Sequence, residues 1–575
     1  MKSKKHVQTP SRAASAAWSL RAWHVAAGGL AALVAAILVY GPALNGPFVF
    51  DDQYLPFFSP LYAEQTMLQA IKGVRPLLYF TFWVNNRVAG TEPYTYHLLN
   101  VLLHVFNALL VFFIARKMLT WAGTQGGRRE WLAAFAGAVF LLHPAQTEAV
   151  AYVASRSENL SVLFFYAAFT VYLYRKSTAV SWPVAAGVLV LYAAAVSTKE
   201  HTITLPALLL LTDYYWNPGF SLQGIRRNWR LYVPLAVTGA AGFALVLRLV
   251  RGATTAGFGI AGLPWYDYFY TQWRALWVYF RLFVAPVGLN ADYDYPISRS
   301  VLDHGAIAGL AGLLLLVGCA VYFRKRFPLA SYGYLAALIL FAPTSSIMPI
   351  QDAVAERRLY LPMVALLLVV VEFLRRWKAP PLVLAASASL VLAALGIAGY
   401  QRSQVWSSDV ALWEDTVRKS PHNSRAHFQL GVAYYQQGRC ESAALQYAAA
   451  DRPGQPDERL LLDWALAEDC LNRPEAALEK LQRAVRVRPT AYGYSLMGMI
   501  YGKQKKYTEA LSALRTALAI NPREDMAYFY RGNVSAAMGD LGKAVEDYRR
   551  AVEINPDNGL ARRGLDRAEM RLRQR

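Results

Sequence analysis

Two adjacent carboxylates stand at a position where charge is costly. Asp51 and Asp52 follow an apolar run, Val25 to Leu44, that is long enough to cross a lipid bilayer. An aspartate at mid-membrane costs roughly 2.5–3.5 kcal/mol, so charge close to such a run marks a candidate functional site. A carboxylate here can accept a proton from an attacking hydroxyl, as a general base does. The simpler interpretations are a solvated loop and a helix N-cap.

More charged and titratable side chains flank later apolar runs, and the predicted topology places them on the same side as the acidic pair. An arginine among them can hold phosphate oxygens in a bidentate manner and stabilise the charge that develops as a phosphate leaves. The shared side predicts one cavity at the outer membrane edge, suited to inverting displacement of a sugar from a polyprenyl phosphate. These residues are His143, Glu148, Arg156, Glu158, Lys199, Glu200, His201, Glu356, Arg357 and Arg358.

Structural roles remain open for the same residues. His143 precedes Pro144, and ending a helix there is a better interpretation than catalysis. Lys199 and Glu200 suit an interfacial pair with a snorkelling lysine. The run from Glu356 to Arg358 suits an ion pair that anchors a loop.

The elements that position these residues are predicted to be membrane-spanning helices. Of the 575 residues 55% are hydrophobic, and the apolar segments give about eleven spans between residues 23 and 400, after a basic cytoplasmic N-terminus at 1–22. We expect the first span to be retained, not cleaved as a signal peptide. The segments are 23–44, 96–116, 131–143, 159–174, 181–197, 201–216, 231–250, 303–323, 329–349, 360–375 and 381–399.

The charge distribution predicts the orientation of these spans. The formal charge is +21, but the basic residues form short clusters between apolar runs, which is typical of the positive-inside rule and disfavours a nucleic-acid partner. All the clusters fall on one side only if the aromatic segment 265–288 does not cross. We therefore expect this segment to lie in the outer interface.

A second domain with regular charges and a 34-residue period follows a linker at 401–422. Gly498 recurs as Gly532, and Ala510 as Ala544. This is the tetratricopeptide period, and it predicts a helical solenoid of about four repeats at 423–575, outside the cytoplasm. Such a solenoid binds peptides in its concave face, whereas packing between helices is an equally good role for its tyrosines. The tyrosines proposed to contact the acceptor are Tyr434, Tyr492, Tyr494, Tyr528 and Tyr530.

The three cysteines show no metal-ligand spacing. Cys319 lies in an apolar segment, while Cys440 and Cys470 lie in the solenoid. A disulfide between these two is possible from the sequence, which leaves it undecided.

The order of motifs along the chain resembles a known family. The motifs are FVFDD, RPLLYFTFWVN, YHLLNVLLH, LLHPAQTEAVAYVASRSENL, STKEHTITLP and AERRLYLP, followed by the tetratricopeptide repeats. This order is similar to that of the transmembrane and tetratricopeptide-repeat-containing O-mannosyltransferases, which are related to enzymes of the GT-C fold. The resemblance implies an all-α protein: a polytopic GT-C-type helix bundle followed by a C-terminal solenoid.

The resemblance also implies a reaction and roles for residues. The expected enzyme moves a mannose-like sugar from a polyprenyl phosphate to a protein Ser or Thr hydroxyl. Asp51 matches the acid that serves as base in related enzymes, and Asp52 would orient the acceptor or hold water. Arg75 also matches a motif position, although IKGVRPLLYF keeps only Arg75 and Pro76 of that motif. A bacterial homologue would use undecaprenyl phosphate at the inner membrane, with its repeats in the periplasm.

Two alternative functions and the need for a metal ion are also considered. The first rival is a transferase that acts on a glycan or lipid, and the second is a non-catalytic, membrane-anchored scaffold. We expect no metal and no required cofactor, although Asp51, Asp52 and Glu148 offer oxygen ligands for a divalent cation.

Overall fold

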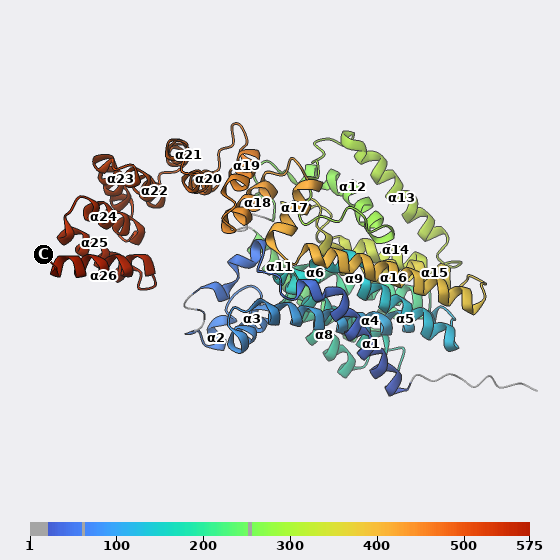
Figure 1. Cartoon of the computed structure of the whole chain (residues 1–575). Helices are drawn as coiled ribbons and strands as arrows, with labels where there is room; N and C mark the ends of the chain where they lie inside the picture. Colours follow the sequence, from blue (N-terminus) through green and yellow to red (C-terminus); the bar gives the residue numbers. More distant parts are fainter. Residues whose placement is uncertain (1–20, 60–61, 63, 251–255, 575) are drawn as a thin grey trace, which may run out of the picture. The chain divides into compact units, whose positions relative to one another are not determined.

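A computed structural model of the protein describes residues 21–59, 62, 64–250 and 256–574. All regular elements among these residues are helices. One isolated β-bridge pairs Ala256 with Ile350. The all-α class is thus confirmed. The chain forms two compact units, Met1–Leu412 and Trp413–Arg575 (Figure 1).

The first unit is a bundle of long apolar helices, and each of the eleven predicted apolar segments overlaps one of them. Near its centre, α4 packs against α1, α5 and α7. Shorter helices in the connections are α2 (Met67–Ala70), α3 (Pro76–Ala89), α6 (Thr147–Ala151) and α10 (Gln223–Arg227). The long helices are α1 (Ala22–Tyr40), α4 (Pro93–Trp121), α5 (Gly126–Leu142), α7 (Arg156–Leu173), α8 (Trp182–Val196), α9 (Leu205–Trp216), α11 (Trp229–Val250), α12 (Trp265–Val284), α13 (Ala306–Tyr322), α14 (Pro328–Phe341), α15 (Met363–Leu374) and α16 (Pro381–Val405).

Four helical segments of the described chain are long and apolar enough to cross a bilayer: Ala22–Ala43, Pro93–Trp121, Asp303–Tyr322 and Pro381–Val405. Three more apolar helices, α8, α14 and α15, are shorter than a typical span. These helices indicate a membrane protein. The count of eleven spans is not confirmed by them and stays a prediction.

Helix α12 has two different faces, as the prediction for 265–288 requires. It buries Asp267 and Tyr268, whereas Trp265, Tyr266 and Trp277 are exposed. Exposed aromatic side chains on one face are typical of a helix that lies in the membrane interface.

Small residues allow several of the apolar helices to approach closely. A Cβ atom on Gly333 of α14 would lie 2.4 Å from the carbonyl oxygen of Ala365 on α15. A Cβ on Gly137 of α5 would lie 3.0 Å from the carbonyl oxygen of Ala108 on α4. Glycine at such contacts lets backbones meet without a side chain between them, as in membrane helix pairs.

The second unit is a solenoid of consecutive helix pairs. Each pair packs along its own length and against the next pair, which is the arrangement expected of tetratricopeptide repeats. Helix α17 (Asp409–Lys419) precedes the pairs. The solenoid helices are α18 (Ser424–Gln436), α19 (Cys440–Ala450), α20 (Glu458–Cys470), α21 (Pro474–Val487), α22 (Ala491–Lys503), α23 (Tyr507–Ile520), α24 (Asp525–Ala537), α25 (Leu541–Ile554) and α26 (Gly559–Arg573).

The glycines of the 34-residue period stand where the two helices of a pair touch. A Cβ on Gly498 would lie 2.5 Å from the side chain of Leu514, and one on Gly532 would lie 2.8 Å from the ring of Tyr548. Gly431 of the first pair makes a similar contact, at 2.5 Å from the ring of Tyr447. The period therefore reflects a steric requirement that recurs from pair to pair.

Cys440 and Cys470 form a disulfide in the structure. It joins the start of α19 to the end of α20, across 30 residues of sequence. Cys319, on α13, is a free and exposed cysteine.

We predict that Gly532→Val destabilises the solenoid by about 1–3 kcal/mol, because the added side chain meets Tyr548 in a packed contact. Hydrogen exchange of α24 to α26 in the full chain measures this loss. Gly542→Ala is the matched control, since a Cβ there meets only the Asp540 side chain, at 3.8 Å, and Ala favours a helix. Equal protection in both variants would contradict the steric interpretation.

Candidate functional site

A line of polar side chains on α4 positions the backbone of the candidate site. Its members are buried and recur every three or four residues, so they share one face of the helix. Asn100 donates to the carbonyl oxygens of Val150 and Tyr152, at 3.2 Å each. Asn107 donates to the carbonyl oxygen of Asn159 at 2.9 Å. The members of this α4 polar stripe are His97, Asn100, His104 and Asn107.

Arg156, at the start of α7, is fixed in place by the same stripe. Its Nε donates to Oδ1 of Asn100 at 3.0 Å, and its Nη2 donates to the carbonyl oxygen of Tyr96 at 2.9 Å. Its guanidinium also lies 4.6 Å from the ring centroid of Phe82, within cation–π distance. The side chain is fully buried. In this arrangement Arg156 holds the segment 149–156 against α4.

Asp52 connects the loop after α1 to the segment after α6. It lies in a 3₁₀ helix, η2 (Phe50–Tyr54), and its carboxylate accepts from the backbone N–H of Ala154 at 2.6 Å and of Val49 at 3.3 Å. Asp52 is fully buried. Burial raises the pKa of its carboxyl group to about 8, although both backbone hydrogen bonds lower it.

Asp51 differs from its neighbour, because its side chain is exposed. Its backbone N–H donates to the hydroxyl of Tyr152 at 3.0 Å. The preceding residue, Phe50, has a φ of 57°, which is rare for a residue with a side chain. Such strain persists only where the surroundings impose it, and it often occurs at functional sites. The two acids thus differ: one is buried and hydrogen-bonded, and the other faces outward.

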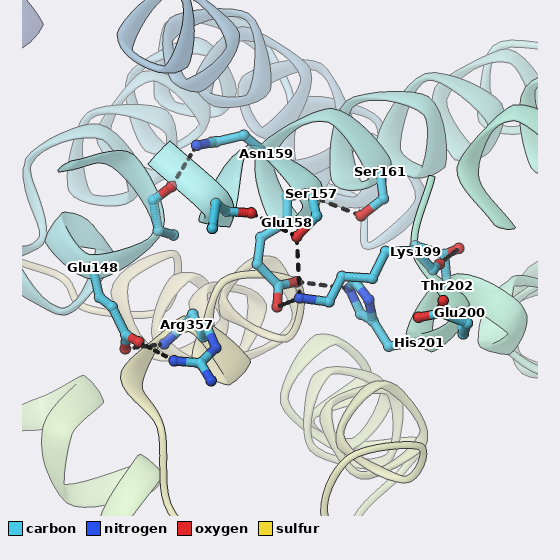
Figure 2. A network of polar contacts seen from close by, with 12 residues as sticks. Glu148, Ser157, Glu158, Asn159, Ser161, Lys199, Glu200, His201, Thr202 and Arg357 are labelled. Atoms are coloured by element: carbon cyan, nitrogen blue, oxygen red, sulfur yellow. Dashed lines mark hydrogen bonds and ion pairs between the residues drawn. The ribbon is translucent and has the colours of Figure 1, made fainter. Parts of the chain in front are cut away.

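Three ion pairs join segments that are far apart in sequence. Arg75 binds Glu200 in a bidentate manner, with Nε–Oε1 at 3.1 Å and Nη2–Oε2 at 2.9 Å. Lys199 binds Glu158, with Nζ–Oε1 at 2.5 Å. Figure 2 shows this second pair with His201, whose Nε2 lies 3.2 Å from Oε2 of Glu158.

The third pair joins Glu148 to Arg357. The carboxylate accepts from the Arg357 guanidinium and, at 2.8 Å, from the Arg357 backbone N–H (Figure 2). Nη2 of Arg357 also lies 3.4 Å from Asp352. Glu148 thus fixes both the backbone and the side chain of Arg357.

The ion pairs and the acidic loop form one electrostatic cluster. Burial lowers the pKa of Lys199, Glu158 opposes this shift, and the positive charges of Arg75 and Arg357 add to it. Burial and the negative charges of Asp52 and Asp51 raise the pKa of Tyr152, whereas Arg357 lowers it. Tyr152 therefore lies within range of both the acidic pair and Arg357. We call these groups the outer charge cluster, after the side of the membrane that the sequence predicts for them: Asp51, Asp52, Arg75, Glu148, Glu158, Lys199, Glu200, His201 and Arg357.

Two other predicted residues take up contacts beside this cluster. Glu356, at the start of the 3₁₀ helix η9 (Glu356–Leu359), accepts from the Asn290 backbone N–H and, at 2.8 Å, from the Tyr293 hydroxyl. Arg358 donates to the Tyr268 hydroxyl at 3.1 Å and to backbone carbonyl oxygens of the same loop. Both side chains are buried, whereas that of Arg357 between them is 21% exposed.

His143 forms two hydrogen bonds at the end of α5. Its Nδ1 accepts from the Ala145 backbone N–H at 3.2 Å, and its Nε2 lies 3.0 Å from the carbonyl oxygen of Phe283. Because Nδ1 accepts a hydrogen bond, the ring proton is on Nε2, which donates a hydrogen bond to the carbonyl oxygen of Phe283. The ring fixes the turn after the helix.

Some cationic groups of the cluster keep hydrogen-bond donors that are not used within the described chain. Arg75 uses Nε and Nη2 for Glu200, so its Nη1 protons remain, and its side chain is 34% exposed. Lys199 donates to Glu158 and Ser157, and its third ammonium proton remains. These donors can bind an anion.

The five solenoid tyrosines proposed from the sequence do not share one environment. Tyr434 is buried, donates to Glu414 at 2.7 Å and lies under the Arg439 guanidinium. Tyr528 donates to the carbonyl oxygen of Pro522 at 3.3 Å. Tyr492 is 40% exposed, while Tyr494 and Tyr530 pack partly against apolar clusters.

The α4 polar stripe and Tyr152 support the site but were not among the residues predicted from the sequence. The α4 polar stripe stands in the motif YHLLNVLLHVFN, where four polar residues at helical spacing interrupt an apolar segment. That spacing was the available signal, since polar side chains inside an apolar helix need partners. Tyr152 gave no comparable signal.

Within the described residues, no group of three or more His, Cys, Asp or Glu side chains is placed to hold a metal ion. Asp51, Asp52 and Glu148, the three carboxylates considered for a cation, do not form such a group.

Comparison with known proteins identifies relatives along most of the chain. A family model for the tetratricopeptide repeat matches residues 410–458 and 495–559. Protein O-mannosyl-transferase F38B6.6 of Caenorhabditis elegans is 26% identical over 72% of this chain and 60% of its own. Human protein O-mannosyl-transferase TMTC3 is 23% identical over 85% of this chain and 58% of its own. Among solved structures, YrrB, described as a TPR protein with an unusual peptide-binding site, is 22% identical over 30% of this chain and 87% of its own, with a TM-score of 0.24.

These relatives confirm the resemblance inferred from the order of motifs. The curated relatives are protein O-mannosyl-transferases of the transmembrane and tetratricopeptide-repeat-containing family. The chain spans about 60% of their length.

We predict that Tyr152→Phe loosens the loop that carries Asp51, because it removes the hydroxyl that accepts from the Asp51 backbone. One hydrogen bond is worth about 1 kcal/mol, so exchange of the Asp51 amide should accelerate about fivefold. Hydrogen exchange with mass spectrometry measures this. Tyr174→Phe is the control, since that hydroxyl donates to Phe113. No change in the loop would contradict the assigned role of Tyr152.

Proposed function

We propose that this protein is a membrane O-mannosyltransferase that moves mannose from a polyprenyl phosphate to a Ser or Thr hydroxyl of a protein. The observation that carries the proposal is the outer charge cluster. In it, Tyr152 lies within electrostatic range of both the exposed Asp51 and Arg357, and Lys199 lies within range of Arg75 and Arg357. The names of the curated relatives support the sugar and the protein acceptor.

Asp51 is the general base in this proposal. The acceptor hydroxyl attacks the anomeric carbon, a new carbon–oxygen bond forms, and the bond from that carbon to the phosphate oxygen breaks. The hydroxyl proton passes to Asp51, and the polyprenyl phosphate leaves with the bonding electron pair. One direct displacement inverts the anomeric centre. The exposure of Asp51, next to the buried and hydrogen-bonded Asp52, supports this division of roles.

The cations of the cluster hold the donor phosphate. Arg75 and Lys199 are the best candidates, because each keeps unused donors and is partly exposed. A guanidinium or ammonium group beside the leaving oxygen stabilises the negative charge that grows there. Arg357, positioned by Glu148, is the third candidate. Arg156, Glu356, Arg358 and His143 act as positioning residues, since each forms hydrogen bonds to other parts of the fold.

An apolar cavity in the bundle offers a path for the isoprenoid chain. It has a volume of about 640 Å³, lies between α1, α4 and α5, and is lined mainly by alanine, glycine and larger apolar side chains. Its lining extends along α5 from Gly127 to Leu142, which precedes His143. Such walls suit a hydrocarbon chain that cannot form hydrogen bonds.

The finer topology belongs to the same proposal: about eleven spans, a GT-C arrangement, an inner-membrane location and a solenoid on the far side from the cytoplasm. The Cys440–Cys470 disulfide supports that side for the solenoid, because disulfides persist in oxidising compartments and are rare in the cytosol. The repeats would recruit the acceptor protein, in keeping with the role of tetratricopeptide repeats in binding proteins.

We predict that Asp51→Asn lowers the turnover number at least 10²-fold, because the amide cannot take up the hydroxyl proton. The measurement is transfer of labelled mannose from polyprenyl-phosphate mannose to acceptor protein by the purified full chain. Glu92→Gln, which changes an exposed acid between α3 and α4, is the control and keeps activity. Full activity in Asp51→Asn would exclude Asp51 as the base. A separate measurement tests the acceptor class. It compares the intact masses of outer-compartment proteins from wild-type cells and from cells that lack this protein. Equal masses would favour a glycan or lipid acceptor.

We predict that Arg75→Gln raises the KM for polyprenyl-phosphate mannose at least tenfold, since it removes a charged donor to phosphate. Arg87→Gln is the control. Arg87 lies on α3, the helix that Arg75 precedes, and contacts Gln65 and Trp83. A KM that is unchanged in Arg75→Gln would assign the phosphate to Lys199 or Arg357 instead.

A further inference from the structure

The end of α16 packs against the elements on both sides of the acidic loop, residues 44–54. Helix α16 contacts α1 and the 3₁₀ helix η1 (Gly41–Ala43), which precede the loop, and it also contacts α6, which precedes Tyr152. Trp406 is the C-cap of α16 and stands three residues before the start of α17. The last turn of α16 is therefore a candidate support for the loop that carries Asp51.

The backbone of Trp406 touches the first part of this loop. A Cβ atom on Gly46 would lie 2.6 Å from the carbonyl oxygen of Trp406, which is closer than side chains approach in proteins. The carbonyl oxygen of Gly46 lies 3.2 Å from Nε2 of His97, a member of the α4 polar stripe. Gly46 is thus held between α4 and α16, and the absence of a side chain lets the backbones approach.

The indole ring of Trp406 touches the residue that binds the second part of the loop. The ring centroids of Trp406 and Tyr152 lie 6.0 Å apart, with 33° between the ring planes, which is within the range of aromatic pairs. The Tyr152 ring in turn lies 6.1 Å from the ring of Phe50, and its hydroxyl accepts from the Asp51 N–H at 3.0 Å. Trp406 is 5% exposed, so this contact is buried.

The backbone between these two contacts is strained. Phe50 has a φ of 57° and directly precedes Asp51. Such a conformation persists only where the surrounding structure imposes it. The chain is fixed at Gly46, four residues before Phe50, and again at Asp51 through Tyr152. Trp406 contacts both of these fixed points.

We propose that Trp406 is a positioning residue of the acidic loop. Its carbonyl group and its indole ring hold the two ends of the strained segment, so that the Asp51 carboxylate stays where an acceptor hydroxyl reaches it. This inference rests on the proposed function in one respect, the use of Asp51 as the base.

The position of Trp406 predicts which kinetic constant depends on it. Arg75 and Lys199, the best candidates to hold the donor phosphate, bind Glu200 and Glu158 and are fixed without α16. A misplacement of about 1 Å at a reacting group can cost about 10²-fold in rate. A change at Trp406 should therefore lower kcat and leave the KM for the donor unchanged.

The test compares Trp406→Leu with Trp406→Phe in the purified full chain. The first variant removes the aromatic contact with Tyr152, and the second keeps a ring there. Hydrogen exchange with mass spectrometry follows the Asp51 amide, and transfer of labelled mannose from polyprenyl-phosphate mannose gives kcat and KM. For Trp406→Leu we expect about threefold faster exchange, from the loss of one aromatic pair. We also expect kcat to fall at least tenfold with the KM unchanged. Trp406→Phe should restore kcat toward the wild-type value.

Trp216→Leu is the matched control. Trp216 also stands at the end of a helix, α9, and its ring lies 6.2 Å from that of Trp121, again with 33° between the ring planes. In Trp216 as in Trp406, the indole nitrogen is buried and has no hydrogen-bond partner among the residues that the structure describes. The control should keep the wild-type exchange of the Asp51 amide. Equal acceleration in both variants would reveal a general loosening of the bundle and overturn the proposal.

Gly46→Ala tests the backbone contact with Trp406 left in place. The added Cβ meets the Trp406 carbonyl oxygen, so exchange of the Asp51 amide should accelerate as it does in Trp406→Leu. Gly396→Ala on α16 is the control, because a Cβ there lies 4.0 Å from the Val39 side chain and fits without displacement. If circular dichroism shows that Trp406→Leu does not fold, Gly46→Ala decides the outcome.

The outcomes separate this inference from the proposed function. Wild-type exchange of the Asp51 amide in a folded Trp406→Leu or Gly46→Ala variant would overturn the inference. Faster exchange with an unchanged kcat would also overturn it where Asp51→Asn is inactive, because the base would then not need this support. Full activity of Asp51→Asn, together with faster exchange in Trp406→Leu, would remove the proposed base and leave Trp406 as the support of the loop.

Discussion

The α4 polar stripe and Arg156 hold together the part of the bundle on which the candidate site depends. The segment between α6 and α7 has irregular backbone, and its carbonyl oxygens need donors where water is scarce. Asn100 supplies donors to two of them and at the same time accepts from Arg156. Without this arrangement, the Tyr152 hydroxyl that contacts Asp51 and the Ala154 peptide group that contacts Asp52 would have no fixed position.

The same arrangement explains why the charged residues of one motif have different roles. Along LLHPAQTEAVAYVASRSENL, His143 and Arg156 turn inward and satisfy buried polar groups, whereas Glu148 and Glu158 reach cations from other segments. The run from Glu356 to Arg358 divides in the same way. Alternation along a tight turn sends Arg357 toward the cluster and its two neighbours into the fold.

Much of the fold was predictable, because its signals are local. Apolar length predicted the long helices, and the 34-residue period predicted the helix pairs, with glycines where aromatic rings cross. The shared location of the charged residues was also predictable in outline. Their partners were not, since pairs such as Arg75 with Glu200 depend on which spans become neighbours, and no local pattern encodes that. Tyr152, which touches the acidic loop through its hydroxyl, looked like any other aromatic residue.

The apolar helices of the bundle fall into long and short ones. Helices α8, α14 and α15 are apolar but short, so length alone does not decide whether they cross. The buried faces of all three, with Gly187 on α8 and Gly333 on α14, fit helices that are packed inside protein, where hydrophobic length is a weaker constraint than it is against lipid.

The ion pairs of the outer charge cluster have a consequence for how an anion would enter it. Every cation there already neutralises a carboxylate, so an incoming phosphate competes with an internal counter-ion. If Arg75 turned toward a phosphate, Glu200 would lose its bidentate partner and become the stronger base. Phosphate binding would thus redistribute protons within the cluster. The affinity for phosphate would depend on how much more strongly the Arg75 guanidinium binds phosphate than it binds Glu200.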